Sequence, residues 1–178
     1  MKIVIIRHGK VDMEWDRYYD SVSFDKACSI YDISPIRLSN TRYENKNNDK
    51  IYISGLSRTS ETARMLFGDN DFYKSELLNE VPLRSFTDTI RKLPLIIWNV
   101  IGRLQWFFNN KRQPETRSQT IDRAEKAISM LEKENADCIV VTHACFANTF
   151  TKQLKKRGYK IDKRKFRMNN LERVTAYK

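Results

Sequence analysis

The chain has 178 residues, of which 40% are hydrophobic, and this suits one globular domain with a substantial core. Its apolar start is too short for a secretory signal, and no stretch is long and charge-free enough to span a bilayer. Three cysteines, Cys28, Cys138 and Cys145, form no paired framework. We therefore expect reduced thiols and a cytoplasmic protein.

The formal net charge of +11 is concentrated near the end of the chain. The segment Lys152–Arg167 holds nine lysines and arginines and one acid, Asp162. A solvated helix end is the simpler interpretation of this segment. The alternative is an anchor for nucleic acid or an anionic membrane surface, which would bind with a strong dependence on salt.

The chain opens with four β-branched apolar residues, Ile3 to Ile6, which predict a strand buried on both faces of a parallel sheet. This run ends at Arg7 and His8. The residues from Ser23 to Tyr31 predict a short helix that ends before Pro35.

A second strand is predicted from Ile51 to Ser54, and the following turn carries Arg58. The apolar spacing from Ser57 to Phe67 predicts a helix, which Gly68 ends. The next segment, Leu77–Leu83, is expected to be extended because Pro82 disfavours helical geometry at the residue before it.

An unusual apolar insert occupies residues 87–113 of a single domain that spans residues 1–178. Its apolar residues predict a helix with one buried stripe, formed by Leu93, Ile97, Val100, Ile101, Leu104 and Phe108. Three interpretations remain open for this helix: core packing, a lid over the site, and contact with a membrane surface or another subunit.

The last part of the chain contains the second of its two histidines. Thr116 and Gln119 fit a capping box at the start of a helix that reaches about Glu134. A buried strand, Cys138–Thr142, then ends at His143. A further helix closed by Gly158 and a final strand over residues 172–177 complete a three-layer α/β/α sandwich with a mainly parallel sheet.

Two histidines and two arginines therefore follow the carboxyl ends of predicted strands. Ligands of open α/β sheets bind at this edge, so we expect Arg7, His8, Arg58 and His143 to surround one site. Arginine donates paired hydrogen bonds to phosphate oxygens, and neutral histidine is a competent nucleophile near pH 7. The residues predict a site for a phosphoryl group. A metal site at Cys138, His143 and Cys145 is disfavoured because a fourth ligand is lacking.

Four segments resemble the histidine phosphatase superfamily, which has the phosphoglycerate-mutase-like fold. They are Arg7-His8-Gly9, the arginine block at Ser54–Ala63, the second histidine strand at Val140–His143, and the closing strand at Asn170–Thr175. The first two segments in this order carry most of the resemblance, whereas the insert around Trp98 matches none of the family's segments.

The resemblance implies phosphoryl transfer through a phosphohistidine on His8. Arg7, Arg58 and His143 would hold the phosphoryl oxygens, and Glu80 would donate a proton to the leaving group. It implies a small phosphorylated substrate and no metal or organic cofactor.

Some assignments stay open. Glu76 is the alternative to Glu80 as the acid, and Arg84 is a further candidate phosphate contact. Lys10 adds positive charge after the histidine triplet, and Ala144 replaces the family's usual glycine after the second histidine. A phosphomutase of the same fold and a non-catalytic anion-binding protein are the alternatives to a phosphatase.

Overall fold

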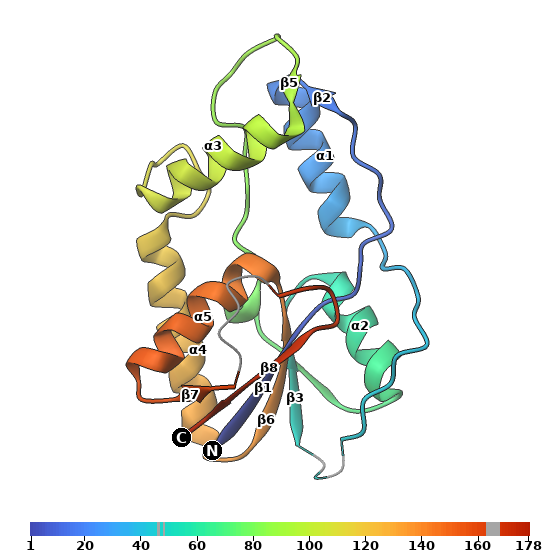
Figure 1. The fold of residues 1–178 in the computed structure, drawn as a ribbon, viewed down its shortest axis with the longest axis vertical. Helices are drawn as coiled ribbons and strands as arrows, with labels where there is room; N and C mark the ends of the chain where they lie inside the picture. Colours follow the sequence, from blue (N-terminus) through green and yellow to red (C-terminus); the bar gives the residue numbers. More distant parts are fainter. Residues whose placement is uncertain (46, 48, 163–167) are drawn as a thin grey trace.

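The computed structural model describes residues 1–45, 47, 49–162 and 168–178, and its centre is a six-stranded sheet with the order β4-β3-β6-β1-β8-β7 (Figure 1). The strands of this sheet are β1 (Lys2–Arg7), β3 (Lys50–Ile53), β4 (Phe72–Lys74), β6 (Cys138–Thr142), β7 (Lys160–Ile161) and β8 (Arg173–Tyr177). Strands β4, β3, β6 and β1 pair in parallel, and β8 pairs antiparallel with both β1 and β7. The predicted mainly parallel sheet is confirmed.

Helices cover both faces of the sheet because its central strands are apolar on both sides. Alternate residues of β1 enter different cores: Ile3 and Ile5 pack with α4 (Arg117–Glu134) and α5 (Ala144–Lys156), whereas Ile6 packs with α2 (Ser57–Phe67). Figure 1 shows α4 and α5 on the side of the sheet opposite α2. The predicted three-layer α/β/α sandwich is therefore present.

Local capping signals define several helix ends. Thr116 and Gln119 form the predicted capping box of α4, and Gly68 ends α2 with a positive φ of 72° that favours glycine. The first helix, α1 (Ser21–Ile33), begins two residues before the predicted start at Ser23, because Asp20 and Ser23 form a capping box.

A third group of elements stands beyond the carboxyl ends of the strands (Figure 1). It contains α1, α3 (Leu95–Phe107) and the small sheet of β2 (Tyr18–Tyr19) and β5 (Leu93–Pro94). The buried centre of this group is formed by Tyr19, Phe24, Ala27 and Trp98. The insert therefore packs on α1 and the segment before it. We call this group the cap.

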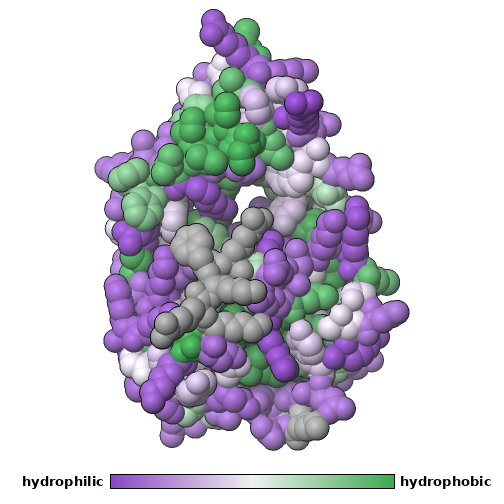
Figure 2. All heavy atoms as spheres, viewed as in Figure 1, coloured by the Kyte–Doolittle hydropathy of each residue, from purple (hydrophilic) through white to green (hydrophobic). Residues whose placement is uncertain are grey.

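The predicted buried stripe of the insert helix is wrong. The buried residues of α3 are Trp98 and Gly102, whereas Val100, Leu104 and Phe108 are exposed. Gly102 lies so close to the segment that carries Leu83 that an added Cβ would be 2.7 Å from Leu83 Cδ1. The apolar patch in the upper half of Figure 2 lies over α3.

The basic segment Lys152–Arg167 begins on the last turns of α5, where Lys155 and Lys156 are exposed. Arg157 instead bonds Glu125 and Glu132 of α4 at 2.7 Å each. Residues 163–167 of the segment lie outside the described residues. In the part of the chain that the structure describes, no helix has the length and apolar content needed to cross a membrane.

Trp98 should be the main source of stability in the cap. It stacks on Phe24 and packs at a tilt against Phe86, with ring centroids 5.2 Å and 4.7 Å away, and its indole N–H donates to the Tyr19 carbonyl at 2.9 Å. We predict that Trp98→Ala lowers the free energy of unfolding by about 3–5 kcal/mol, as measured by urea denaturation. The exposed Val100→Ala on the same helix is the control and should cost less than about 1 kcal/mol. Equal losses for the two variants would contradict the observed orientation of α3.

Candidate active site

The two histidines meet because β1 and β6 are adjacent and in register. Arg7 pairs with Thr142 across the parallel strands, and the His8 backbone N–H donates to the Thr142 carbonyl at 2.9 Å. His8 and His143 therefore leave the sheet side by side, with ring centroids 5.0 Å apart. Both side chains are buried.

His8 has a defined tautomer. Its Nδ1 lies 2.7 Å from the Gly9 carbonyl, which only accepts hydrogen bonds, so we assign the ring proton to Nδ1. The lone pair is then on Nε2. Burial, the positive charge of Arg58 and that of Arg7 lower the His8 pKa to about 3. His8 is therefore neutral at pH 7, with an unprotonated ring nitrogen.

His143 bonds two neighbouring side chains. Its Nδ1 accepts a hydrogen bond from Arg58 Nε at 3.2 Å, and its Nε2 lies 2.7 Å from Ser54 Oγ. Because the guanidinium only donates, His143 carries its proton on Nε2 and donates to Ser54. Burial and the neighbouring His8 and Arg58 hold the His143 pKa well below its usual value. The histidine thus helps to fix the position of Arg58.

Arg58 is fully buried in the first turn of α2. Its Nη1 donates to Asp32 Oδ1 at 3.0 Å, and its guanidinium lies 5.2 Å from the centre of the Tyr31 ring. Within the described part of the chain, its buried Nη2 donates no hydrogen bond. A buried guanidinium nitrogen without an acceptor is a ready donor to an anion.

Sequence reasoning missed Ser54, Tyr31 and Asp32 as members of the site. Ser54 lies inside the recognised arginine block and could have been noticed there. Tyr31 and Asp32 lie on the last turns of α1, where no local pattern distinguishes them from other surface residues. Their contact with Arg58 arises from the packing of α1 near α2.

Arg7 lies at the end of β1 and is half-buried. Its Nη1 donates to the Met168 carbonyl at 2.8 Å. Its charge also reaches the histidines, because it lowers the pKa of both His8 and His143. The structure thus brings Arg7, Arg58, His8 and His143 into one electrostatic cluster.

Glu80 lies beside the first turn of α5, which directly follows His143 in the sequence. Its carboxylate accepts hydrogen bonds from the backbone N–H groups of Val81 at 2.9 Å, Phe146 at 3.0 Å and Cys145 at 3.3 Å. The negative charge at a helix N-terminus is favourable because the first backbone N–H groups have no partner within the helix. The side chain is therefore held facing the histidine-bearing turn.

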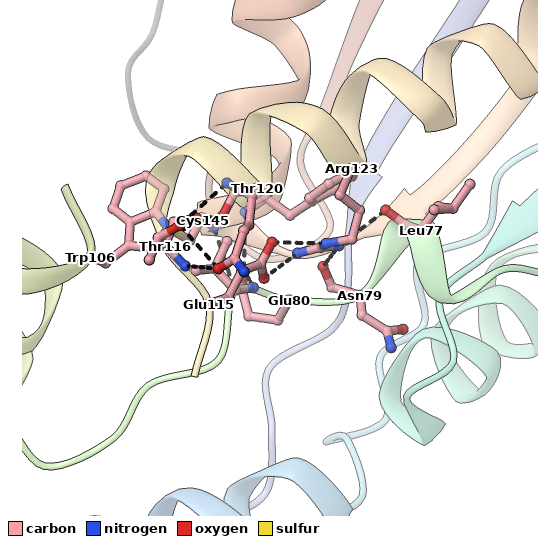
Figure 3. A network of polar contacts seen from close by, with 12 residues as sticks. Leu77, Asn79, Glu80, Trp106, Glu115, Thr116, Thr120, Arg123 and Cys145 are labelled. Atoms are coloured by element: carbon pink, nitrogen blue, oxygen red, sulfur yellow. Dashed lines mark hydrogen bonds and ion pairs between the residues drawn. The ribbon is translucent and has the colours of Figure 1, made fainter. Parts of the chain in front are cut away.

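A second anchor holds the segment that carries Glu80. Arg123 of α4 donates to the carbonyls of Leu77 and Asn79 at 3.0 and 2.7 Å, and it pairs with Glu115 at 2.8 Å. Figure 3 shows this arginine between the two carbonyls and the carboxylate. In contrast, Glu76 is exposed at the start of the 3₁₀ turn η1 (Glu76–Leu78).

A cleft of about 1100 Å³ lies between the cap and the sheet edge. Arg58, Glu76 and Glu80 line it from the sheet side. The cap contributes Trp15, Tyr31 and Asp32, together with the α3 residues Leu95, Asn99 and Arg103. The insert helix therefore forms one wall of a cleft that Arg58 and Glu80 line from the other side, whereas Arg7, His8 and His143 are not among its lining residues.

The remaining predicted residues are Arg84, Lys10 and Ala144, and only the first of them lines the cleft. Arg84 lines the cleft but is exposed and pairs with Asp25 at 3.7 Å. Lys10 is exposed and is not among the residues that line the cleft. Ala144 begins α5 directly after His143 and is not among the residues with positive φ, so alanine fits there without backbone strain.

The fold resembles solved phosphatases over almost its whole length. A phosphoserine phosphatase mutant from Entamoeba histolytica superposes with a TM-score of 0.60 at 16% identity, covering 98% of this chain and 89% of that one. The mycobacterial glucosyl-3-phosphoglycerate phosphatase gives 0.57 at 16% identity, with 98% and 88% covered. A protein described as a putative α-ribazole-5′-P phosphatase from Escherichia coli gives 0.53 at 20% identity, with 86% and 79% covered.

At these identities the structural likeness shows the fold. A comparison of the sequence with functionally curated proteins gives no match. The model of the histidine phosphatase superfamily (branch 1) matches residues 3–176, which is nearly the entire chain and includes all four segments singled out in the sequence. The chain belongs to the histidine phosphatase superfamily.

Proposed function

We propose that this chain is a phosphatase that hydrolyses a phosphate monoester through a phosphohistidine on His8. The observation that carries this proposal is the pairing of a neutral His8, whose Nε2 bears the lone pair, with the buried Arg58. His8 supplies a nucleophile at neutral pH, and Arg58 supplies a positive charge for the phosphoryl oxygens.

In the first step, His8 Nε2 attacks phosphorus and the bond to the leaving oxygen breaks. In this proposal Arg7, Arg58 and His143 hold the phosphoryl oxygens, and His143 exchanges its Nε2–H bond to Ser54 for one to phosphate. Arg58 is preorganised for that role, because Asp32 and His143 fix two of its nitrogens while Nη2 has no acceptor among the described residues.

Glu80, in its protonated form, donates its proton to the leaving oxygen. In the second step it removes a proton from water, which attacks phosphorus and releases phosphate from the histidine. Glu80 is favoured over Glu76 because backbone N–H groups of the turn after His143 hold its carboxylate. Glu76 lines the same cleft but is exposed.

The substrate is proposed to be a small phosphorylated metabolite. The cleft has room for a leaving group of that size, and the similar structures named above are phosphatases of phosphoserine and glucosyl-3-phosphoglycerate. The insert helix is proposed to act as a lid, because Leu95, Asn99 and Arg103 face the cleft.

His8→Ala should abolish turnover of a generic aryl phosphate. Loss of a covalent nucleophile lowers kcat on the order of 10⁴-fold or more. Wild-type protein should also retain acid-labile phosphate when quenched with base, and the variant should not. The rate should be insensitive to a metal chelator, and Leu38→Ala, at an exposed position, is the control that should keep the wild-type rate.

The alternative functions give different results in the same assay. A non-catalytic anion-binding protein would bind phosphate without turnover or labelling. A phosphomutase would transfer the phosphoryl group from His8 to a hydroxyl of an added phosphorylated diol, whereas a phosphatase would release it as inorganic phosphate. Equal rates for His8→Ala and wild type would exclude the proposed mechanism.

Glu80→Gln and Glu76→Gln form a matched pair that tests the acid. We expect Glu80→Gln to lower kcat about 10²–10⁴-fold for an alkyl phosphate, whose leaving group needs a proton. The loss should be much smaller for p-nitrophenyl phosphate, which leaves as a stable anion. Glu76→Gln should leave both rates within about twofold. A larger loss in Glu76→Gln would reverse the assignment.

A neutral, buried His8 should make the fold less stable in acid. The usual histidine pKa is 6.5, and that of folded His8 is about 3, so between these values the unfolded chain binds a proton that the folded chain does not. The free energy of unfolding therefore falls as the pH decreases below 6.5. Between pH 7 and pH 5, urea denaturation should show wild type losing about 2 kcal/mol more than His8→Gln. Parallel losses would mean that folded His8 is already protonated at pH 5.

A further inference from the structure

The outer face of α3 is an apolar surface that no described residue covers. Its side chains are large and exposed: Ile96 (65%), Val100 (49%), Leu104 (49%), Phe107 (46%) and Phe108 (73%). Figure 2 shows the resulting patch over α3, with hydrophilic residues around it. We call these five residues the α3 outer face. A contiguous apolar patch of this kind usually marks an interaction site.

Packing within the chain does not account for the α3 outer face. Trp98, on the opposite side of the helix, already fills the centre of the cap, and Gly102 beside it lies close to Leu83. The Trp106 indole donates to Thr120 Oγ1 at 2.9 Å and anchors the end of α3 to α4 (Figure 3). Because Trp98 and Trp106 both hold the helix in place, its outer face is directed away from the core.

Cations outnumber acids around this surface. Residues 89–113 contain five lysines and arginines and no acid. Among them, Arg112 pairs with Asp88, and Arg103 lines the cleft. Arg91, Lys92 and Lys111 are exposed near the two ends of α3. Arg117 adds a further cation, 4.7 Å from the Phe107 ring.

We propose that the α3 outer face docks onto an anionic lipid bilayer. A helix with large apolar residues on one side and flanking cations is suited to the membrane interface, where the side chains enter the acyl boundary and the cations meet lipid phosphates. A second copy of this chain is a poorer occupant. Pairing α3 with itself would bring the flanking cations of one copy against those of the other, because the nearby carboxylate of Asp88 already pairs with Arg112.

The proposal goes beyond the phosphatase activity and does not depend on it. It has a spatial consequence for the cleft, because Asn99 and Arg103 line the cleft from the same helix. Docking would hold that wall of the cleft beside the bilayer surface.

The test is cosedimentation of the full chain with phosphatidylcholine vesicles that contain or lack phosphatidylglycerol. We expect binding to the anionic vesicles that weakens as salt is raised. The double variant Val100→Ser/Leu104→Ser should lower the partition coefficient about tenfold. The triple variant Arg91→Gln/Lys92→Gln/Lys111→Gln should lower it on the order of tenfold or more.

The matched control is Ile33→Ser/Leu38→Ser, which removes two exposed apolar side chains elsewhere and should not change vesicle binding. Circular dichroism and hydrolysis of a soluble aryl phosphate report separately on folding and on the active site. The proposal is overturned if wild type does not bind anionic vesicles, or if the Val100/Leu104 variant binds as tightly as wild type. It is also overturned if Lys155→Gln/Lys156→Gln alone abolishes binding, or if sedimentation shows a dimer that the Val100/Leu104 variant dissociates.

Discussion

The parallel register of β1 and β6 is the constraint on which the candidate site depends. Both strands are apolar on both faces, so hydrophobic alternation alone does not choose between registers one residue apart. Polar groups at the strand ends make that choice. Asp137 Oδ1 accepts from the Lys2 backbone N–H at 2.7 Å, and the His8 backbone N–H bonds Thr142 at the other end. A slip would break these bonds and separate His8 from His143.

Arg58 gives the site its electrostatic character. A buried guanidinium is costly unless its charge is compensated, and here the nearest carboxylate, Asp32, reaches only one of its nitrogens while remaining half-exposed. The same charge disfavours protonation of His8 and His143, so all three groups are more stable when the histidines are neutral. An anion placed among them would compensate the charge that the protein leaves incompletely balanced. The residues whose charge is incompletely balanced are therefore those that would hold a phosphoryl group.

Sequence alone was sufficient for the parts of the fold that local chemistry determines. Buried strands, the capping box at Thr116 and the stop at Gly68 each have a local signal, and they place His8, Arg58 and His143 at one edge. The acid was harder to predict. Glu76 and Glu80 both line the cleft, and they are distinguished by the exposure of Glu76 and by the approach of α5 to Glu80. That contact joins residues far apart in the chain and has no signature in either segment.

The orientation of α3 could not be predicted for a different reason. The helix is apolar around most of its circumference, so its periodicity does not identify the buried side. Steric fit determines which side of α3 is buried. Gly102 allows the helix to approach Leu83 closely, and Trp98 fills the space between Phe24 and Phe86.

The three interpretations of the insert are compatible with one another, because each concerns a different side of α3. Trp98 packs in the cap, Arg103 faces the cleft, and Val100 faces outward. With 3.6 residues per turn, one helix of 13 residues presents each of these sides more than once. Burial of Trp98 fixes the rotation of the helix about its axis. The same contact therefore determines which residues reach the cleft and which remain on the surface.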